Sequence, residues 1–323
     1  MPTGNPTALS FFGIAKEATK GTYVPSVDFL PLTKFDPVDM THWLDDDGLR
    51  GSMAKVYNKI AGPVWSEIGM GGPVFPDTIG YPIASFLGDV TTTGGGAPFT
   101  HAVALKNNSD GQPVSDSLAD FDSVDTRGYT AVQWYDLTFK WDGEKLLTWD
   151  GTAKGFQSAT QSKPTYSNSA ITALPGWLSL VTVNSVSSLT MVDAELKFKR
   201  EGGPIHTADG TQQPYQMFVG AADITGKAVF VADTNSLLTT YLAGTKIPLD
   251  FNFTQGAGAA LVQLKFHFTN TNLNVVKVTR GKQWVEYEAE FEALPNSTDA
   301  GASGGLSHGK VTIQNAKPAS TYV

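Results

Sequence analysis

Side chains that commonly carry catalysis are scarce and scattered in this chain. Cysteine is absent, which excludes disulfides, thiolate metal sites and a cysteine nucleophile. No two of the five histidines lie within four residues of each other, so the i, i+4 pair that binds metal on a helix is missing. One of them, His267, lies on the polar side of a predicted strand, and we expect it to be an ordinary exposed histidine.

Motifs for nucleophilic catalysis and for phosphate binding are also missing. Segment 301–305 reads G-A-S-G-G, which departs from the spacing of a nucleophile elbow and follows no apolar strand. The glycine-rich tracts at 69–72 and 94–96 lack the G-K-[ST] sequence of a phosphate loop. These tracts predict turns, and we expect neither enzyme activity nor a cofactor.

Two clusters of carboxylates could have a purpose. Asp45, Asp46 and Asp47 precede Gly48, but the ligand spacing and flanking helices of an EF-hand are absent, which favours a solvated acidic loop.

The second cluster lies on one predicted strand. The glutamates of segment 285–293 alternate with apolar residues, so neighbouring carboxylates lie about 7 Å apart on one face. Glycosidase carboxylates instead face each other across a cleft. The row is either a solvated face or the lining of an acidic surface. Its members are Glu286, Glu288, Glu290 and Glu292.

Period-2 alternation predicts the strands that would position these residues. Half-buried antiparallel strands are expected at 192–199, 247–254, 262–268, 285–293 and 310–315. The Asp142-Gly143 pair between two apolar runs predicts a hairpin. Helices are expected at 79–87 and 233–244. The fold is therefore predicted to be mainly antiparallel β.

Composition and charge narrow the function classes. The chain has 323 residues, 41% hydrophobic, with 33 Gly and 18 Pro, which suits a large β domain with many turns. Its net charge of −8 is opposite to the electrostatic footprint of a nucleic-acid binder. No signal-peptide pattern and no run of 18 apolar residues is present, so we expect a protein made in a cytoplasm without a membrane span.

Three short stretches resemble the tail tube (major tail) proteins of long-tailed bacteriophages. Residues 13–32 read G-I-A-K-E-A-T-K-G-T-Y-V-P-S-V-D-F-L-P-L, similar to an N-terminal pattern of that family. Residues 220–231 and the closing strand 310–315 resemble two further segments of these proteins. The likeness spans most of the chain, although its motifs are short.

The resemblance implies an antiparallel β-sandwich or half-open β-barrel with one short flanking α-helix and long loops. Six copies would close into a β-barrel ring, and stacked rings would form a tube around a tape-measure protein. A fused second domain would reduce the ring to three, but no internal repeat is evident. Tail terminator and distal tail or baseplate proteins would be further partners. DNA would pass through the lumen without specific binding, and the tail would assemble in the host cytoplasm before becoming part of the virion.

Within this frame, the chain divides into four segments. Residues 1–33 are expected to form an N-terminal arm, 34–74 a long loop for contacts between rings, 75–295 the β core, and 296–323 a flexible loop with a C-terminal strand or arm. The glutamate row at 286–292 is the first candidate for the lumen lining, and the mixed-charge face at 193–199 is the second. Candidate contacts between rings are Trp43, Asp45, Asp46, Asp47 and Arg50.

Two other function classes remain open from the sequence. A monomeric β-sandwich module that binds carbohydrate or a cell surface could use Trp141, Trp149 and Trp177 as stacking platforms, although core packing also explains them. A hydrolase on a β scaffold is the third class, and the missing motifs argue against it.

Overall fold

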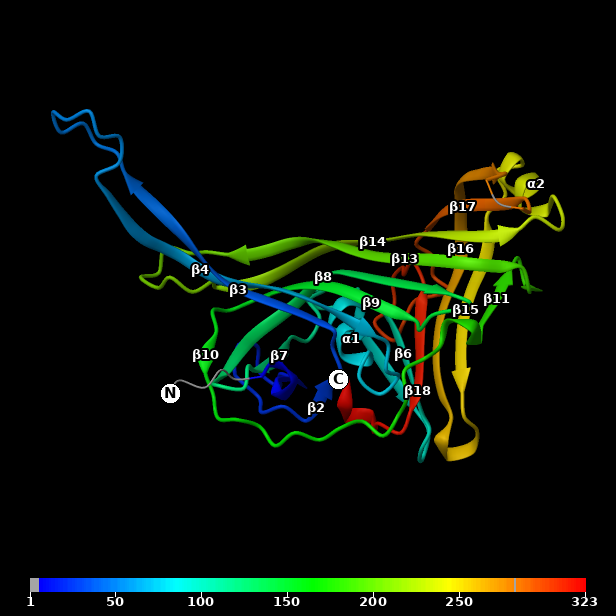
Figure 1. Cartoon of the computed structure of the whole chain (residues 1–323), viewed down its shortest axis with the longest axis horizontal. Coiled ribbons are helices and arrows are strands. Elements are labelled where there is room, and N and C mark those ends of the chain that lie inside the picture. Colours follow the sequence, from blue (N-terminus) through cyan, green and yellow to red (C-terminus); the bar gives the residue numbers. More distant parts are fainter. Residues whose placement is uncertain (1–5, 282) are drawn as a thin grey trace.

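A computed structural model describes residues 6–281 and 283–323 of the chain, and its main feature is a long antiparallel sheet (Figure 1). Its strands, in spatial order, are β3 (Lys34–Asp46), β4 (Asn58–Pro73), β9 (Thr148–Gly155), β8 (Thr126–Asp142), β13 (Met191–Ile205), β14 (Gln216–Val231), β17 (Glu286–Ala293) and β16 (Val262–Thr279). We call this the long sheet. Its strands carry the alternation of buried and exposed residues that period-2 patterns predict.

A second sheet crosses the long sheet steeply in Figure 1. It contains β12 (Val186–Ser188), β11 (Ser179–Val183), β15 (Ile247–Gln255), the first half of β16, β18 (Lys310–Asn315), β6 (Phe99–Leu105) and β5 (Gly88–Thr93). A third group of strands, β1 (Phe11–Lys16), β2 (Asp28–Leu30), β7 (Asp116–Phe121) and β10 (Ala159–Thr160), joins the first half of β8. Short 3-10 turns lie at Thr7–Leu9, Gly176–Leu178, Gly258–Ala260 and Ala319–Thr321.

The core fills the space between these sheets and encloses a helix. Helix α1 (Gly80–Leu87) is buried along its whole length, and its Phe86 ring lies 5.8 Å from that of Phe198 on β13. Across the sandwich, the rings of Phe139 and Phe266 lie 5.0 Å apart. Burial of this aromatic layer is the main source of stability, because each ring removes a large apolar area from water.

The partly buried Arg200 ties α1 to the long sheet. Its guanidinium donates to the carbonyl of Phe86 at 2.6 Å and to that of Gly220 at 2.9 Å. Burial lowers the pKa of Arg200 to about 10, so the side chain stays charged at neutral pH. A cation at the last turn of a helix satisfies free carbonyls and complements the helix dipole.

The expected mainly antiparallel β fold is confirmed, and both predicted helices are present. α1 is enclosed rather than flanking, and α2 (Ser236–Leu242) lies at one end of the long sheet. The sheets do not close into a barrel within one chain. Strand β9 runs through the Asp150-Gly151 pair without a turn. Gly151 is required inside this strand because a Cβ there would lie 2.8 Å from the Trp134 ring.

Several segment boundaries expected from the sequence are wrong. Segment 34–74 is not a loop but the hairpin of β3 and β4, with a turn at 47–57 (Figure 1). Its period was hidden because small residues, Gly62 and Ser66, take inward positions where apolar residues are expected.

The N-terminal segment is also part of the body rather than an arm, although residues 1–5 of that prediction lie outside the described residues. β1 pairs with β2 and β7, and Ile14 is fully buried. The buried Glu17 carboxylate accepts hydrogen bonds from the backbone N–H of Gly21 and of Ala131, both at 2.8 Å. Glu17 therefore ties the N-terminal segment to β8, which carries Ala131.

The last residues are anchored in the core. The Tyr322 hydroxyl donates to the carbonyl of Asp77 at 2.9 Å, and its ring packs edge-on against Tyr81 at 5.1 Å. A Cβ on Gly80 would lie 2.4 Å from this ring, so α1 starts with glycine to make room for it. The expected flexible loop before β18 is held too, because Ser303 donates its N–H to Asp89.

Replacing Tyr322 tests this anchor. We expect Tyr322→Ala to lower the free energy of unfolding by about 3–5 kcal/mol, because it opens a cavity beside α1. Tyr322→Phe should lower it by only about 1 kcal/mol, through the lost hydroxyl. Urea denaturation measures both, with the exposed Val323→Ala as control. A Tyr322→Ala chain as stable as the wild type would contradict the anchor.

His267 is not the ordinary exposed histidine expected from the sequence. Its Nδ1 forms a short contact with Asp250 Oδ1, and its Nε2 lies 3.1 Å from Thr269 Oγ1 and 3.5 Å from Asp299 Oδ1. The hydrogen bond to Asp250 raises the pKa of His267, against the opposing effect of burial. The His267 side chain therefore links β15 and β16 to the loop that carries Asp299.

This link makes part of the stability depend on pH. Because the folded-state pKa of His267 is raised, its contribution is complete below the unfolded pKa of about 6.5 and is lost as pH rises through the folded value. We therefore expect the stability difference between wild type and His267→Gln to be largest near pH 5–6 and to shrink at higher pH. Denaturation from pH 5 to 9, with His42→Gln as control, measures it. A difference that stays constant with pH would rule out this role.

Candidate functional site

The outward face of the long sheet is polar and crossed by ion pairs. On the neighbouring strands β8, β13, β14 and β17, acids and lysines alternate in register, with Glu195 opposite both Lys140 and Lys227. Lys227 Nζ lies 3.0 Å from Glu288 Oε1, and Lys140 Nζ lies 3.3 Å from Glu195 Oε2. Cross-strand pairs of opposite charge stabilise such a face, although each partly exposed pair contributes little.

Acids outnumber lysines on these four strands. The acids of this face are Asp136, Asp142, Asp193, Glu195, Asp223, Glu288, Glu290 and Glu292. The lysines are Lys140, Lys197, Lys199 and Lys227. We call this surface the polar face.

The structure places three of the four predicted glutamates on the polar face. Glu290 is exposed, and Glu288 and Glu292 are partly exposed. Glu286 is buried instead, and it accepts a hydrogen bond from Trp284 Nε1 at 2.9 Å. It differs from the other three in its position, because it is the first residue of β17. The sequence analysis did not identify Lys227 as the ion-pair partner of Glu288. The alternation in its strand could have predicted that its side chain faces outward.

The second predicted face, Asp193 to Lys199, is part of the same surface. Strand β13 pairs with β14, and β14 pairs with β17, so both candidate faces belong to one continuous sheet. Glu195 also contacts Lys197 closely. The two alternatives from the sequence therefore combine into a single candidate surface.

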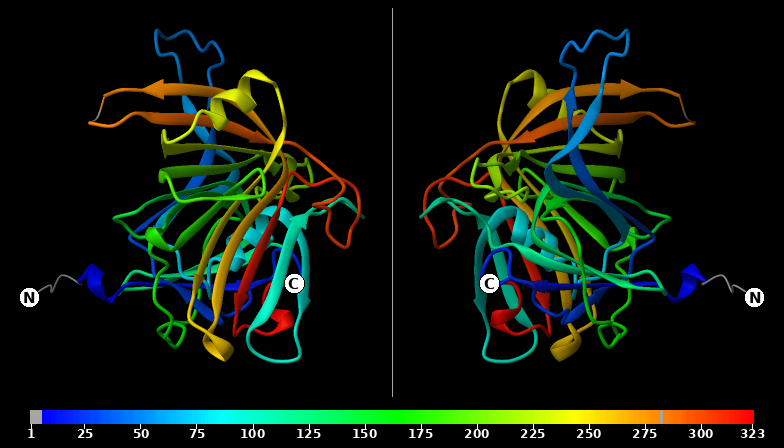
Figure 2. Two further views of the ribbon diagram at one scale, coloured as in Figure 1. Left: turned by 90° about the vertical axis from the view of Figure 1, so that its right-hand side faces the viewer. Right: turned by 90° about the vertical axis from the view of Figure 1, so that its left-hand side faces the viewer.

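The β3–β4 hairpin carries the other predicted site residues and projects beyond the body at one end (Figures 1 and 2). Asp46 pairs with Arg50 across the turn, and Asp45 Oδ1 lies 3.1 Å from Lys59 Nζ. Trp43 is 54% exposed. Asp47 is exposed at the start of the turn.

Apolar residues near the tip were missed by the sequence reasoning. Leu49 and Met53 are fully exposed, and Leu44 and Ile60 are about half-exposed. The sequence did contain a signal for them, because apolar residues in a polar, glycine-containing turn are unusual unless another surface covers them. The base of the hairpin is braced by Gln212, whose Nε2 donates to the Ala61 carbonyl at 2.8 Å.

Two edges of the long sheet are unpaired among the described strands. β3 has β4 on one side only. β16 pairs with β15 as far as Thr271, and beyond that residue it has only β17 beside it. Free strand edges present unpaired backbone groups and are suited to pairing with another chain.

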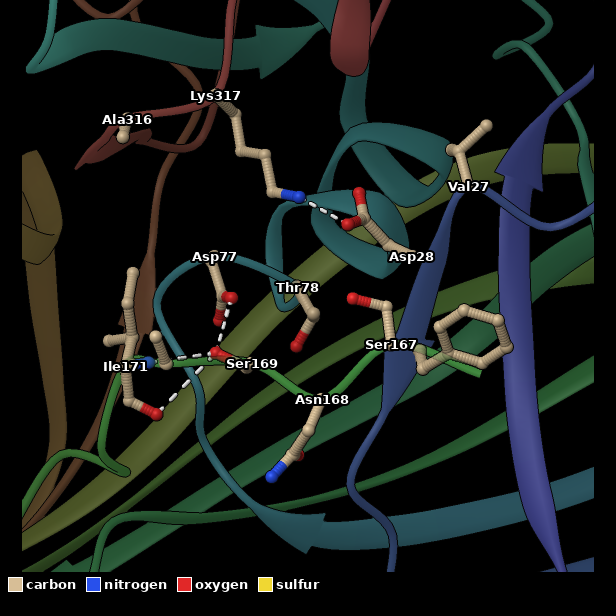
Figure 3. A pocket seen from close by; sticks show the side chains of 12 residues that line it. Val27, Asp28, Asp77, Thr78, Ser167, Asn168, Ser169, Ile171, Ala316 and Lys317 are labelled. Atoms are coloured by element: carbon tan, nitrogen blue, oxygen red, sulfur yellow. Dashed lines mark hydrogen bonds and ion pairs between the residues drawn. The ribbon is translucent and has the colours of Figure 1, made fainter. Parts of the chain in front are cut away.

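A pocket of about 350 Å³ lies near the C-terminal residues (Figure 3). Its polar lining residues form contacts that link distant segments of the chain, and they do not form a reactive group. Asp28 pairs with Lys317 and accepts a hydrogen bond from the Tyr81 hydroxyl at 2.6 Å. Asp77 accepts one from Ser169 Oγ at 2.6 Å, and burial raises the pKa of Asp77. No histidine lines this pocket to activate a nucleophile.

The other kinds of site considered from the sequence are a metal site, a glycan-binding surface and a membrane span. Within the described residues, no group of three His, Cys, Asp or Glu side chains is placed to hold a metal ion. Trp141 and Trp149 are buried in the core, so they are not stacking platforms for a glycan. Trp177 is exposed. No helix in the described part of the chain has the length and apolar character needed to cross a membrane.

A known protein family matches this chain. Residues 7–312 match the protein family described as phage tail tube protein. The match covers nearly the whole chain, including all the strands of the long sheet. No curated protein matches the chain.

Proposed function

The chain belongs to the phage tail tube family and is a structural protein of the phage tail, and we propose that six copies close into a ring whose stacked repeats conduct DNA. The observation that carries this proposal is the polar face of a long sheet with two unpaired edges. Pairing the β3 edge of one copy with the β16 edge of the next would satisfy the unpaired backbone groups of both strands. A closed ring leaves no free edge.

The polar face would line the bore. It is covered by charged and small polar side chains, whereas the opposite face of the same sheet is buried in the core. Its excess of acids would repel the phosphate backbone, so DNA would slide rather than bind. Lysines paired to these acids would keep the glutamates from repelling one another and destabilising the sheet.

The hairpin tip would join one ring to the next. An arm that projects beyond the body with uncovered Leu49 and Met53 needs a partner surface in the assembled state. Trp43 and the pairs of Asp45 and Asp46 would form the stem of this contact.

Other tail proteins would complete the assembly. The family supports self-assembly together with other tail components, and we expect a tape-measure protein in the bore during assembly. A tail terminator at one end and distal tail or baseplate proteins at the other would cap the same surfaces that join rings. Assembly would take place in the host cytoplasm.

Shortening the tip tests stacking. Replacing residues 47–57 with a two-residue Asn-Gly turn should leave the body folded and stop tube growth, because the contact between rings is lost. Negative-stain microscopy should then show rings or single copies in place of tubes. A matched control shortens the exposed turn at 207–211. Normal tubes from the 47–57 variant would exclude the tip as a stacking contact.

Reversing charge on the polar face tests whether this face lines the bore. We expect phage assembled with Glu288→Lys, Glu290→Lys and Glu292→Lys to form tails of normal length, but DNA delivery should fall about tenfold or more because the wall now attracts phosphate. Plaque titre per particle measures this, with Glu144→Lys in the β8–β9 turn as control. An unchanged titre would show that the charge of the polar face plays no part in DNA delivery. Failed assembly would indicate that these residues lie in an interface between copies.

A further inference from the structure

An open groove lies at the end of the molecule opposite the hairpin tip. It has a volume of about 580 Å³ and lies between α2, the β11–β12 hairpin and the end of β14. Val186, Leu189 and Leu237 contribute to its apolar lining. Leu189 is 90% exposed, so this part of the groove is uncovered in the single chain.

We propose that this groove receives the hairpin tip of a second copy, namely residues 47–57 of a chain in the next ring. This inference rests on the proposed tube function and names the surface that accepts the tip. The two surfaces lie at opposite ends of the longest axis of the molecule, the tip beyond β3 and β4 and the groove beside α2 (Figure 1).

Shape and apolar character favour a copy of this chain as the occupant. The tip is a narrow projection that ends in Leu49 and Met53, which are 101% and 104% exposed. The groove is a concave surface whose lining combines apolar side chains, such as Val186, Leu189 and Leu237, with hydroxyl groups of serine and threonine. Apolar surface left open on both ends of one chain is covered when copies join head to tail.

Charge is complementary across the same contact. Asp47 and Lys55 are exposed on the tip. Asp233 is exposed and lines the groove, and the exposed Lys246 directly precedes the groove residue Ile247. Among the described residues, none of these four side chains has an ion-pair partner within its own chain. Lys55 can therefore meet Asp233 while Asp47 meets Lys246, which would set the orientation of the tip.

The direction of the contact explains growth along one axis. A contact between two different surfaces of identical chains repeats without closing, and it generates an open stack. The same contact made by each of six copies would add together, so a weak single contact is enough to hold two rings.

Cysteine cross-linking tests the contact cleanly because the chain has no cysteine of its own. Met53→Cys and Leu189→Cys are prepared as separate full-length proteins, mixed under assembly conditions and oxidised mildly. A disulfide needs Cα atoms within about 7 Å, so a tip lying in the groove should give disulfide-linked dimers in the mixture. The pair Leu49→Cys with Val186→Cys samples a second position along the groove.

The matched control mixes Met53→Cys with Val124→Cys, an exposed position in the β7–β8 turn. We expect about tenfold more dimer from the groove pair than from this control, because assembly raises the local concentration of the two thiols. A chain with both Met53→Cys and Leu189→Cys should give a ladder of covalent multimers.

The outcomes separate this inference from the tube function. Tubes in the microscope with no cross-link from either groove pair would overturn the groove and leave the tube standing. Equal cross-linking in the control would also overturn it. Absence of both tubes and cross-links would overturn the groove and the proposed function together. In a second test, Lys55→Glu alone should reduce the yield of tubes. Adding Asp233→Lys to the same chain should restore the yield, because the two charges are then exchanged and still attract each other.

Discussion

The long sheet has one face that must be buried and one face that must remain in contact with water, and the other features of the molecule depend on this asymmetry. Its inner face packs Phe139 and Phe198 against α1 and the second sheet. Because the core is filled from that side alone, the outer face is left for charged residues. The same strands therefore supply stability on one side and the candidate bore lining on the other.

Burial of α1 holds the two sheets at a fixed distance. The helix contacts the core along its whole length, with Arg200 at its end and Tyr322 beside its first residue. Residues far apart in the chain thus support one helix, and this helix packs against the sheet that carries the polar face. A rigid face is what a repeating ring needs, because small changes of curvature in each copy would add up around the circle.

Much of the β architecture could be predicted from the sequence, for a physical reason. Strands β15, β17 and β18 alternate apolar and polar residues because one side is buried, and that period is local information. The β3–β4 hairpin could not be predicted in this way, since its inner positions use Gly62 and Ser66 and its outer half leaves the body. Pairing partners such as Lys227 and Glu288 depend on register between strands distant in the chain, which no local pattern carries.

The candidate site was predicted in part. The glutamate row was found because it alternates, but the burial of Glu286 and its hydrogen bond from Trp284 depend on contacts that the alternation does not show. The central claim is that the polar face lines the bore of a ring of six. A cryo-electron microscopy map of tubes grown from the purified chain tests it most directly. We predict six copies per ring, with Glu288 and Glu290 facing the channel and the tip reaching the next ring. A map with the second sheet facing the channel, or with the polar face on the outside of the tube, would contradict it.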